Sequence, residues 1–213
     1  MKIIEYGNNW FIEDQLDDEF LNDIKNFFDK NLEFLYKDKK GYSTTGKNAE
    51  QYWIQLKGEK HFHYKNKEYE DIERRFREGI RRRLKSASFL KNDDIQLRQS
   101  TAWTVIGEEG SYHTIHTHRS GRMNGVAVVL YLNVPDSEDH SNCLFLVLHA
   151  DPSNDFINQG YPSFHHVKPE VGTLLIFPYH VPHGTYPQTK GTRQTFNVDY
   201  NFLEESKSTL NYF

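Results

Sequence analysis

The sequence has little that would place it outside a reducing compartment or in a membrane. Cys143 is its single cysteine, which excludes an internal disulfide and is typical of proteins in reducing compartments. No apolar run approaches the ~18 residues of a membrane-spanning helix. The first residues, MKIIEYGNNWF, lack the apolar centre of a secretion signal. We therefore expect a cytoplasmic protein with no membrane partner.

The charge and composition predict one globular domain with no general affinity for polyanions. The net charge of −4 gives no bias toward nucleic acid, which is not expected as a partner. Hydrophobic residues make up only 37% of the chain, but 15 Phe, 13 Tyr and 3 Trp supply large apolar areas for a core. The 213 residues suit a single domain over 1–213. We expect helical and flap segments in 1–94 and a β core in 95–213.

Two amphipathic helices are predicted in the first half of the chain. Apolar residues recur at steps of three and four over residues 17–36 and again over 68–90. Asp14 or Asp17 is the candidate cap of the first helix. The second helix has an arginine-rich face. This is most simply a solvated surface, with an acidic partner or nucleic acid as the alternative.

The segment 37–67 between the two helices is polar, contains glycines and shows no regular period. Loops of this length are usually functional or mobile. We interpret it as a flap that contacts substrate, with Tyr52 and Trp53 as candidate substrate-binding residues. An irregular surface segment held by its aromatic side chains is the alternative.

The second half of the chain has the pattern of short strands. β-branched and aromatic runs at 95–106, 125–134, 142–150, 172–178 and 192–202 alternate with turn-rich pieces. Two helices followed by many strands, with no helix between them, predict an antiparallel fold. We therefore expect a mainly β sandwich or barrel with the helices packed on one face.

Histidines gather directly before the most apolar of these strands. His113, His116 and His118 occur within six positions of GSYHTIHTH. On an extended chain, residues two apart point to the same side, so His116 and His118 can approach one metal ion. His183, after the strand GTLLIFP, could complete the site. Imidazole is a common ligand of iron, zinc, copper and nickel.

Arg193 adds a second chemical feature ten residues beyond His183. An arginine in an apolar strand is costly unless it pairs with an anion, and its guanidinium fits a carboxylate with two bonds. Thr195 would point to the same side, and Tyr131 could add a phenol from a neighbouring strand. A metal beside a carboxylate clamp suits a short dicarboxylate bound end to end, such as 2-oxoglutarate. A surface arginine on an edge strand is the alternative.

Residues 103–202 resemble the Fe(II)/2-oxoglutarate-dependent oxygenases, close to the prolyl-hydroxylase-like branch. The matching positions are Gly110, Tyr112 and His116, then Tyr131, Leu132 and Asn133, then Gly172, Leu174, Phe177 and His183, then Gly191 and Arg193. The resemblance implies a double-stranded β-helix, or jelly roll. It also implies Fe(II), 2-oxoglutarate and O2 as cofactors, and a hydroxylase that converts 2-oxoglutarate to succinate while oxidising a substrate C–H bond. In the family, the tyrosine of Y-L-N commonly helps to hold the cosubstrate's far carboxylate.

The sequence departs from the family at His118, where H-x-D would place an aspartate. One interpretation is a three-histidine metal site of His116, His118 and His183, which would also be the catalytic residues. A second is that His118 does not bind and a coordination position stays open, as in halide-transferring relatives. A third is that His113 or a remote acid such as Asp199 takes its place.

Two other classes of function fit the same residues. One is a three-histidine, cupin-like dioxygenase or isomerase without 2-oxoglutarate, in which Arg193 would bind a substrate carboxylate. The other is a non-enzymatic β-fold module that binds a partner through the arginine-rich helix. For the oxygenase, the resemblance alone favours a peptidyl or amino-acid substrate.

Overall fold

The computed structural model describes residues 1–6, 9–38, 48–55, 66–89, 95–118, 124–135, 145–148 and 164–204. The elements in chain order are β1 Lys2–Tyr6, β2 Asn9–Gln15, α1 Asp18–Asn31, the 3-10 turn η1 Leu32–Phe34, β3 Tyr36–Lys37, β4 Ala49–Gln55, α2 Lys67–Ser86, β5 Ile95–Gly107, β6 His113–His116, β7 Gly125–Asn133, β8 Phe145–Leu148, β9 Phe164–Val167, β10 Thr173–Pro178, β11 His183–Thr185 and β12 Arg193–Glu204. The chain is mainly β with two helices, as the sequence predicts.

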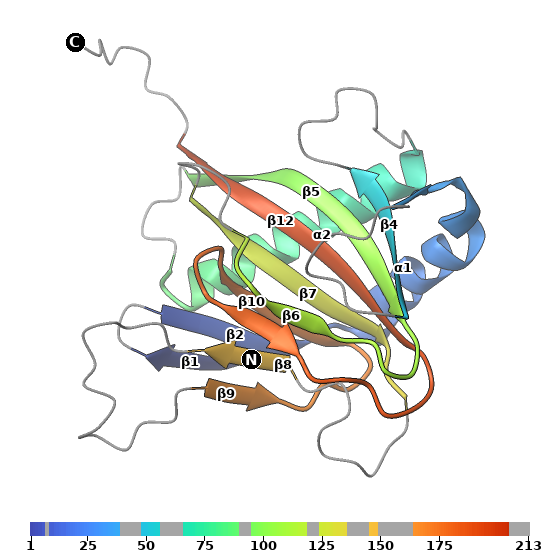
Figure 1. Ribbon diagram of the computed structural model, residues 1–213. Helices are drawn as coiled ribbons and strands as arrows, with labels where there is room; N and C mark the ends of the chain where they lie inside the picture. The colour runs from blue at the N-terminus through green and yellow to red at the C-terminus, as the bar shows by residue number, and fades with distance from the viewer. Residues whose placement is uncertain are drawn as a thin grey trace, which may run out of the picture.

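The strands form two antiparallel sheets (Figure 1). The major sheet has eight strands in the order β1-β2-β10-β7-β12-β5-β4-β3. The minor sheet has four, in the order β6-β11-β8-β9. Strands that neighbour one another in these sheets are often distant in sequence, as expected of a jelly roll. The architecture is the double-stranded β-helix.

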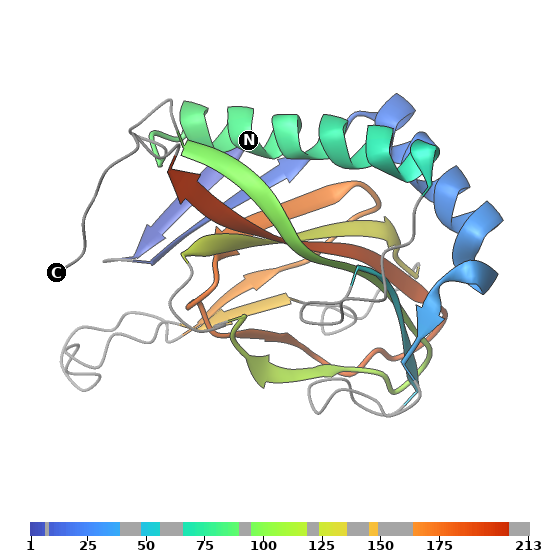
Figure 2. The same ribbon diagram turned by 90° about the horizontal axis from the view of Figure 1, so that it is seen from above.

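Both helices lie on the outer side of the major sheet (Figure 2). Apolar residues of α1 and α2, including Phe28 and Phe76, share one core cluster with alternate residues of β7, β10 and β12. The rings of Phe28 and Phe76 each lie 5.3 Å from the ring of Phe196 on β12. The helices therefore brace the sheet from outside and leave its inner face for the minor sheet.

Strand β7 shows how the major sheet separates its two faces. Val128 and Leu130 belong to the cluster under the helices, whereas Val129 and Tyr131 belong to a second cluster between the sheets. Successive side chains of a strand point to opposite faces, so a strand covered on both sides reads as one continuous apolar run. This explains the uninterrupted run that precedes Asn133.

Strand β12 alternates in the same way but presents polar residues inward. Phe196 and Val198 pack under the helices, while Thr195, Asn197 and Asp199 line a cavity between the sheets. β12 pairs with β5 on one side and β7 on the other. The inner face of a central strand therefore carries the polar side chains of the site.

The predicted helices are shorter in the structure. α1 is capped by Asp17, whose side chain accepts from the backbone N–H of Phe20, as anticipated for one of the two candidates. It ends at Asn31, where the side-chain amide donates to the carbonyl of Phe27 at 2.7 Å. Such side-chain bonds compete with the helical backbone ladder. α2 ends at Ser86, and Ser88 adopts a φ of 61°, a left-handed conformation typical of helix ends.

The first 94 residues contribute strands as well as helices. β1 and β2 extend the major sheet beside β10, and β3 and β4 extend it beside β5. The flap expected at 37–67 thus includes β4, which is paired along its length with β5. Residues 39–47 and 56–65 of that segment lie outside the described residues.

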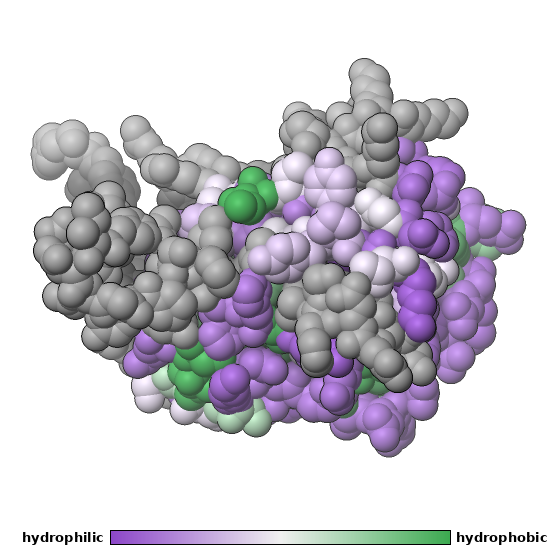
Figure 3. Space-filling view, turned by 60° about the horizontal axis from the view of Figure 1, so that its bottom comes forward, coloured by the Kyte–Doolittle hydropathy of each residue, from purple (hydrophilic) through white to green (hydrophobic). Residues whose placement is uncertain are grey.

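None of the helices in the described residues combines the length and apolar character needed to cross a bilayer. On the face in Figure 3, the hydrophobic side chains among the coloured residues form only small separate patches. Four of the six arginines of α2 form ion pairs: Arg74, Arg75 and Arg83 each pair with an aspartate, and Arg77 pairs with Glu73.

Candidate metal centre

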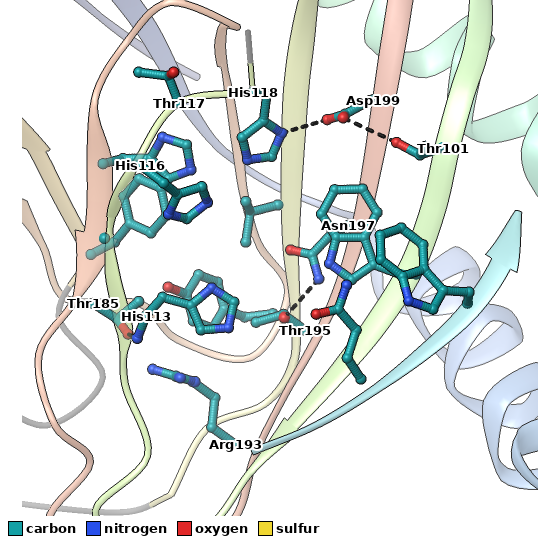
Figure 4. Close-up of a pocket in the computed structure, with 18 residues that line it drawn as sticks. Thr101, His113, His116, Thr117, His118, Thr185, Arg193, Thr195, Asn197 and Asp199 are labelled. Atoms are coloured by element: carbon teal, nitrogen blue, oxygen red, sulfur yellow. Dashed lines mark hydrogen bonds and ion pairs between the residues drawn. The ribbon is translucent and has the colours of Figure 1, made fainter. Parts of the chain in front are cut away.

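Three histidines meet where the minor sheet faces the cavity. His116 ends β6, His118 follows two residues later, and His183 begins β11 directly opposite His116 in the sheet register. One ligand nitrogen from each lies within 4.8 Å of the others. Figure 4 shows the imidazoles of His116 and His118 in the upper part of the cavity. The described residues contain no other such group of three or more histidine, cysteine or acidic side chains.

Each of these imidazoles is held through its Nδ1 atom. His116 Nδ1 lies 2.7 Å from the carbonyl oxygen of Thr114, and His183 Nδ1 lies 2.9 Å from that of Val181. Carbonyl oxygens only accept, so both rings must donate from Nδ1 and keep an unprotonated Nε2 in the neutral state. Metal-binding histidines show this outer hydrogen bond almost always.

His118 has a stronger partner than a carbonyl. Its Nδ1 lies 2.6 Å from the Oδ1 atom of Asp199 on β12, and Asp199 Oδ2 accepts from Thr101 Oγ1 at 3.0 Å. Asp199, one of the two substitutes considered for His118, is thus bonded to that histidine. His113, the other, lies outside the close group, although its ring centre is 5.9 Å from that of His116.

Burial favours the unprotonated form of the histidines at this centre. It lowers the pKa of His183 well below the usual value, and the neighbouring His118 and His116 lower it further. Burial also lowers the pKa of His116, with a further contribution from His118. Unprotonated imidazole is the form that binds metal. The rings of Phe145 and Phe177 pack against His183, with centroid separations of 5.2 and 4.5 Å.

Arg193 lies at the opposite end of the cavity (Figure 4). It begins β12 after a turn at Gly191, whose φ of 67° is easy only for glycine. The side chain is 2% exposed, and its Nη1 atom is buried with no hydrogen-bond partner within the described chain. His113, drawn between Arg193 and the upper histidines, also buries an unpartnered Nε2 atom. A buried cation without a counter-ion calls for an anionic ligand.

Tyr131 and Thr195 line the same cavity as Arg193. They are cross-strand partners on β7 and β12. The Oγ1 atom of Thr195 accepts from Asn197 Nδ2 at 3.0 Å. The cavity has a volume of about 400 Å³, within the usual range for small-molecule sites. Its two ends fit a first-row metal and a carboxylate, respectively.

Aromatic side chains form the wall toward β4 and β5. Trp53 lines the cavity and packs on Trp103 with ring centres 5.2 Å apart, and Trp103 lies 5.8 Å from His118. Tyr52 points to the other face of β4, where it packs against the core under the helices. Trp103 and Asn197 were not among the predicted site residues. Strand alternation could have identified Asn197, because it lies between Thr195 and Asp199 on the same face of β12, and Trp103 pairs with Asn197 across the β5–β12 ladder.

A family profile matches the part of the chain that holds this site. Residues 101–199 match the family described as "Putative 2OG-Fe(II) oxygenase". This stretch includes the three close histidines and Arg193. Among curated proteins, none matches the chain in sequence.

Solved structures of such enzymes share the fold. A Pseudomonas putida prolyl-4-hydroxylase has a TM-score of 0.59 and 16% identity, covering 90% of this chain and 91% of its own. A Trichoplax adhaerens prolyl hydroxylase, in complex with a hypoxia inducible factor oxygen degradation domain peptide fragment, has a TM-score of 0.60 and 14% identity, covering 90% and 83%. A third structure is HygX from Streptomyces hygroscopicus with nickel, 2-oxoglutarate and hygromycin B bound. It has a TM-score of 0.56 and 14% identity, covering 90% of this chain and 82% of its own. At these identities the likeness establishes the fold.

The fold and the residues of the site are similar to those of non-haem metal oxygenases. Residues 101–199, which hold the site, match a 2OG-Fe(II) oxygenase family, and solved prolyl hydroxylases share the fold. Enzymes of this family use Fe(II), 2-oxoglutarate and O2. The unpartnered Arg193 and the three close histidines fit these groups.

Proposed function

We propose that the protein is a hydroxylase in which His116, His118 and His183 hold Fe(II) and Arg193 anchors the distal carboxylate of 2-oxoglutarate. The observation that carries the proposal is the layout of one cavity. Three ligand nitrogens lie within 4.8 Å of one another at one end, and at the other end is the buried guanidinium of Arg193, whose Nη1 atom has no partner among the described residues. Bound Fe(II), with 2-oxoglutarate and O2, supplies the oxidant that hydroxylates a C–H bond while 2-oxoglutarate becomes succinate and CO2.

The side chains of the protein position the reactants. The Nδ1 bonds of the three histidines hold each Nε2 toward a shared point. Arg193 gives the cosubstrate one orientation, and Tyr131 and Thr195 each offer a hydroxyl to the same carboxylate. Phe145 and Phe177 exclude water behind His183, which keeps the ring fixed.

We further propose a peptidyl or amino-acid substrate that enters over the wall of Trp53 and Trp103. Two of the three similar structures named above are prolyl hydroxylases, one of them in complex with a peptide fragment. HygX, with hygromycin B bound, represents a small-molecule alternative. The amides of Gln51 and Asn197 line the same cavity, and amide groups can both donate to and accept from a peptide. Because the chain has one cysteine, we place this activity in the cytoplasm.

One set of measurements tests the reaction class. The purified protein is loaded with Fe(II) anaerobically, and O2 consumption and succinate are measured with and without 2-oxoglutarate. We expect one metal per chain, and O2 consumption that requires 2-oxoglutarate and yields equimolar succinate. O2 consumption with a substrate but independent of 2-oxoglutarate would indicate the cupin-like alternative. Absence of stoichiometric metal would indicate a binding module.

The substrate class is tested by coupling. Proline-containing peptides, free amino acids and an aminoglycoside are compared for their ability to stimulate succinate formation. The proposal expects stimulation by a peptide or amino acid, with one oxygen atom gained by that molecule in its mass spectrum. Stimulation and oxygen gain only with the aminoglycoside would contradict the substrate class while leaving the hydroxylase in place.

A further inference from the structure

Asp199 lies directly behind His118, the residue at which the sequence departs from the family's metal-binding motif. The two residues are 81 positions apart, and Asp199 Oδ1 lies 2.6 Å from His118 Nδ1. The side chains are 16% and 8% exposed, respectively, so solvent screens the pair only weakly. Figure 4 shows His118, Asp199 and Thr101 joined in one chain of hydrogen bonds along the wall of the cavity.

The two neighbouring strands hold the Asp199 carboxylate in place. Thr101 faces Asp199 across the β5–β12 ladder and donates from Oγ1 to Asp199 Oδ2 at 3.0 Å. On the other side, Asp199 pairs with Ala127 of β7, whose small side chain leaves room beside it. The second carboxylate oxygen is thereby occupied, and the first is directed at the imidazole. The orientation of Asp199 is therefore set by the sheet before any metal binds.

A carboxylate behind an imidazole changes that imidazole as a ligand. An ionised aspartate only accepts, so His118 must carry its proton on Nδ1 and present the Nε2 lone pair. Such carboxylate–histidine–metal chains fix the ring and make the ligand nitrogen more basic. The other two histidines have only carbonyl partners. His118 is therefore the one ligand candidate of the three with a negative charge behind it.

We propose that Asp199 is a positioning residue that supplies, from behind His118, the negative charge that H-x-D relatives place on the metal itself. A ligand aspartate cancels one unit of the divalent charge, and a neutral histidine cancels none. Here the carboxylate would stand one imidazole ring away from a metal held by His118. This inference rests on the proposed role of His118 as a ligand.

A double-mutant cycle with Co(II) as the probe tests this role. Co(II) affinity is measured by chelator competition and by its visible absorption in the wild type, Asp199→Asn, His118→Asp and the double variant. Asparagine keeps the shape of residue 199 and removes its charge. We expect Asp199→Asn to weaken Co(II) binding roughly 10- to 100-fold in the wild-type background, the usual loss for an outer partner of a metal ligand. In the His118→Asp background, where residue 118 brings its own carboxylate, we expect no loss.

A loss of Co(II) affinity that occurs in the wild-type background but not in the His118→Asp background separates this role from a merely structural one. An equal loss in both backgrounds, or no loss in either, would overturn the proposal. Thr101→Val serves as a second variant if Asp199→Asn does not fold. It loosens the carboxylate without removing it, and its smaller loss should likewise disappear in the His118→Asp background. If the wild type binds no stoichiometric metal, the proposed function fails. If it binds and turns over 2-oxoglutarate while Asp199→Asn binds Co(II) normally, only this inference fails.

Discussion

Replacing Arg193 with methionine should abolish tight binding of 2-oxoglutarate while leaving the metal site intact. Methionine keeps much of the buried volume and removes the guanidinium. Arg193 is 2% exposed and has an unpartnered Nη1 atom, so the wild-type cavity carries a positive charge that no described residue neutralises. In the variant, the cosubstrate's distal carboxylate would be buried without a cationic partner.

The expected loss follows from the burial of this charge. Truncating one partner of a buried, hydrogen-bonded charge pair costs on the order of 2–5 kcal/mol. At about 1.4 kcal/mol per factor of ten, this is a roughly 30-fold to several-thousand-fold rise in Kd. We expect the upper part of this range, because the carboxylate left behind would lie in an interior with no other described cation beside it.

Thermal unfolding and calorimetry of the metal-loaded protein measure this loss. At 100 times the wild-type Kd, 2-oxoglutarate should stabilise the wild type by about 2.7 kcal/mol. A 30-fold weaker variant would gain only about 0.9 kcal/mol at the same concentration. Without cosubstrate, Arg193→Met should not lower Tm, because it removes an unpaired buried charge. Arg98→Ala, an exposed β5 residue outside the cavity, is the matched control. Unchanged 2-oxoglutarate affinity in a metal-replete Arg193→Met variant would refute the clamp.

Three further outcomes follow from the site. Trp53→Ala should reduce substrate oxidation more than uncoupled 2-oxoglutarate decay, whereas Tyr52→Phe, on the other face of β4, should alter neither; equal effects would argue against the wall. Thr195→Val should weaken 2-oxoglutarate binding by about 1 kcal/mol, one hydrogen bond, and calorimetry showing no change would remove it from the clamp. Burial lowers the pKa of His183 and brings that of His113 to about 3, so the unfolded chain takes up protons that the folded chain does not. The metal-free protein should therefore lose stability as pH falls from about 6.5 toward 3 in urea titrations, and a flat profile would contradict this.

The sequence alone was sufficient for the features that local patterns encode. The apolar run of β7 and the alternation of β12 predicted strands within one or two residues of their observed ends, since strand periodicity follows directly from the backbone. The i, i+2 spacing of His116 and His118 placed both near one side of a strand end. The spacing of these two histidines from His183 and Arg193 was also sufficient to suggest the enzyme class.

Only the tertiary structure decided which neighbours these residues have. The pairing of β4 with β5, in which Trp53 lies opposite Trp103, turns Trp53 to the cavity and leaves Tyr52 under the helices. No local pattern distinguishes these adjacent aromatics. The contact between His118 and Asp199 spans 81 positions and depends on how the two sheets face one another. Because long-range pairing, rather than local periodicity, sets that distance, the sequence could name both residues but could not show that one stands behind the other.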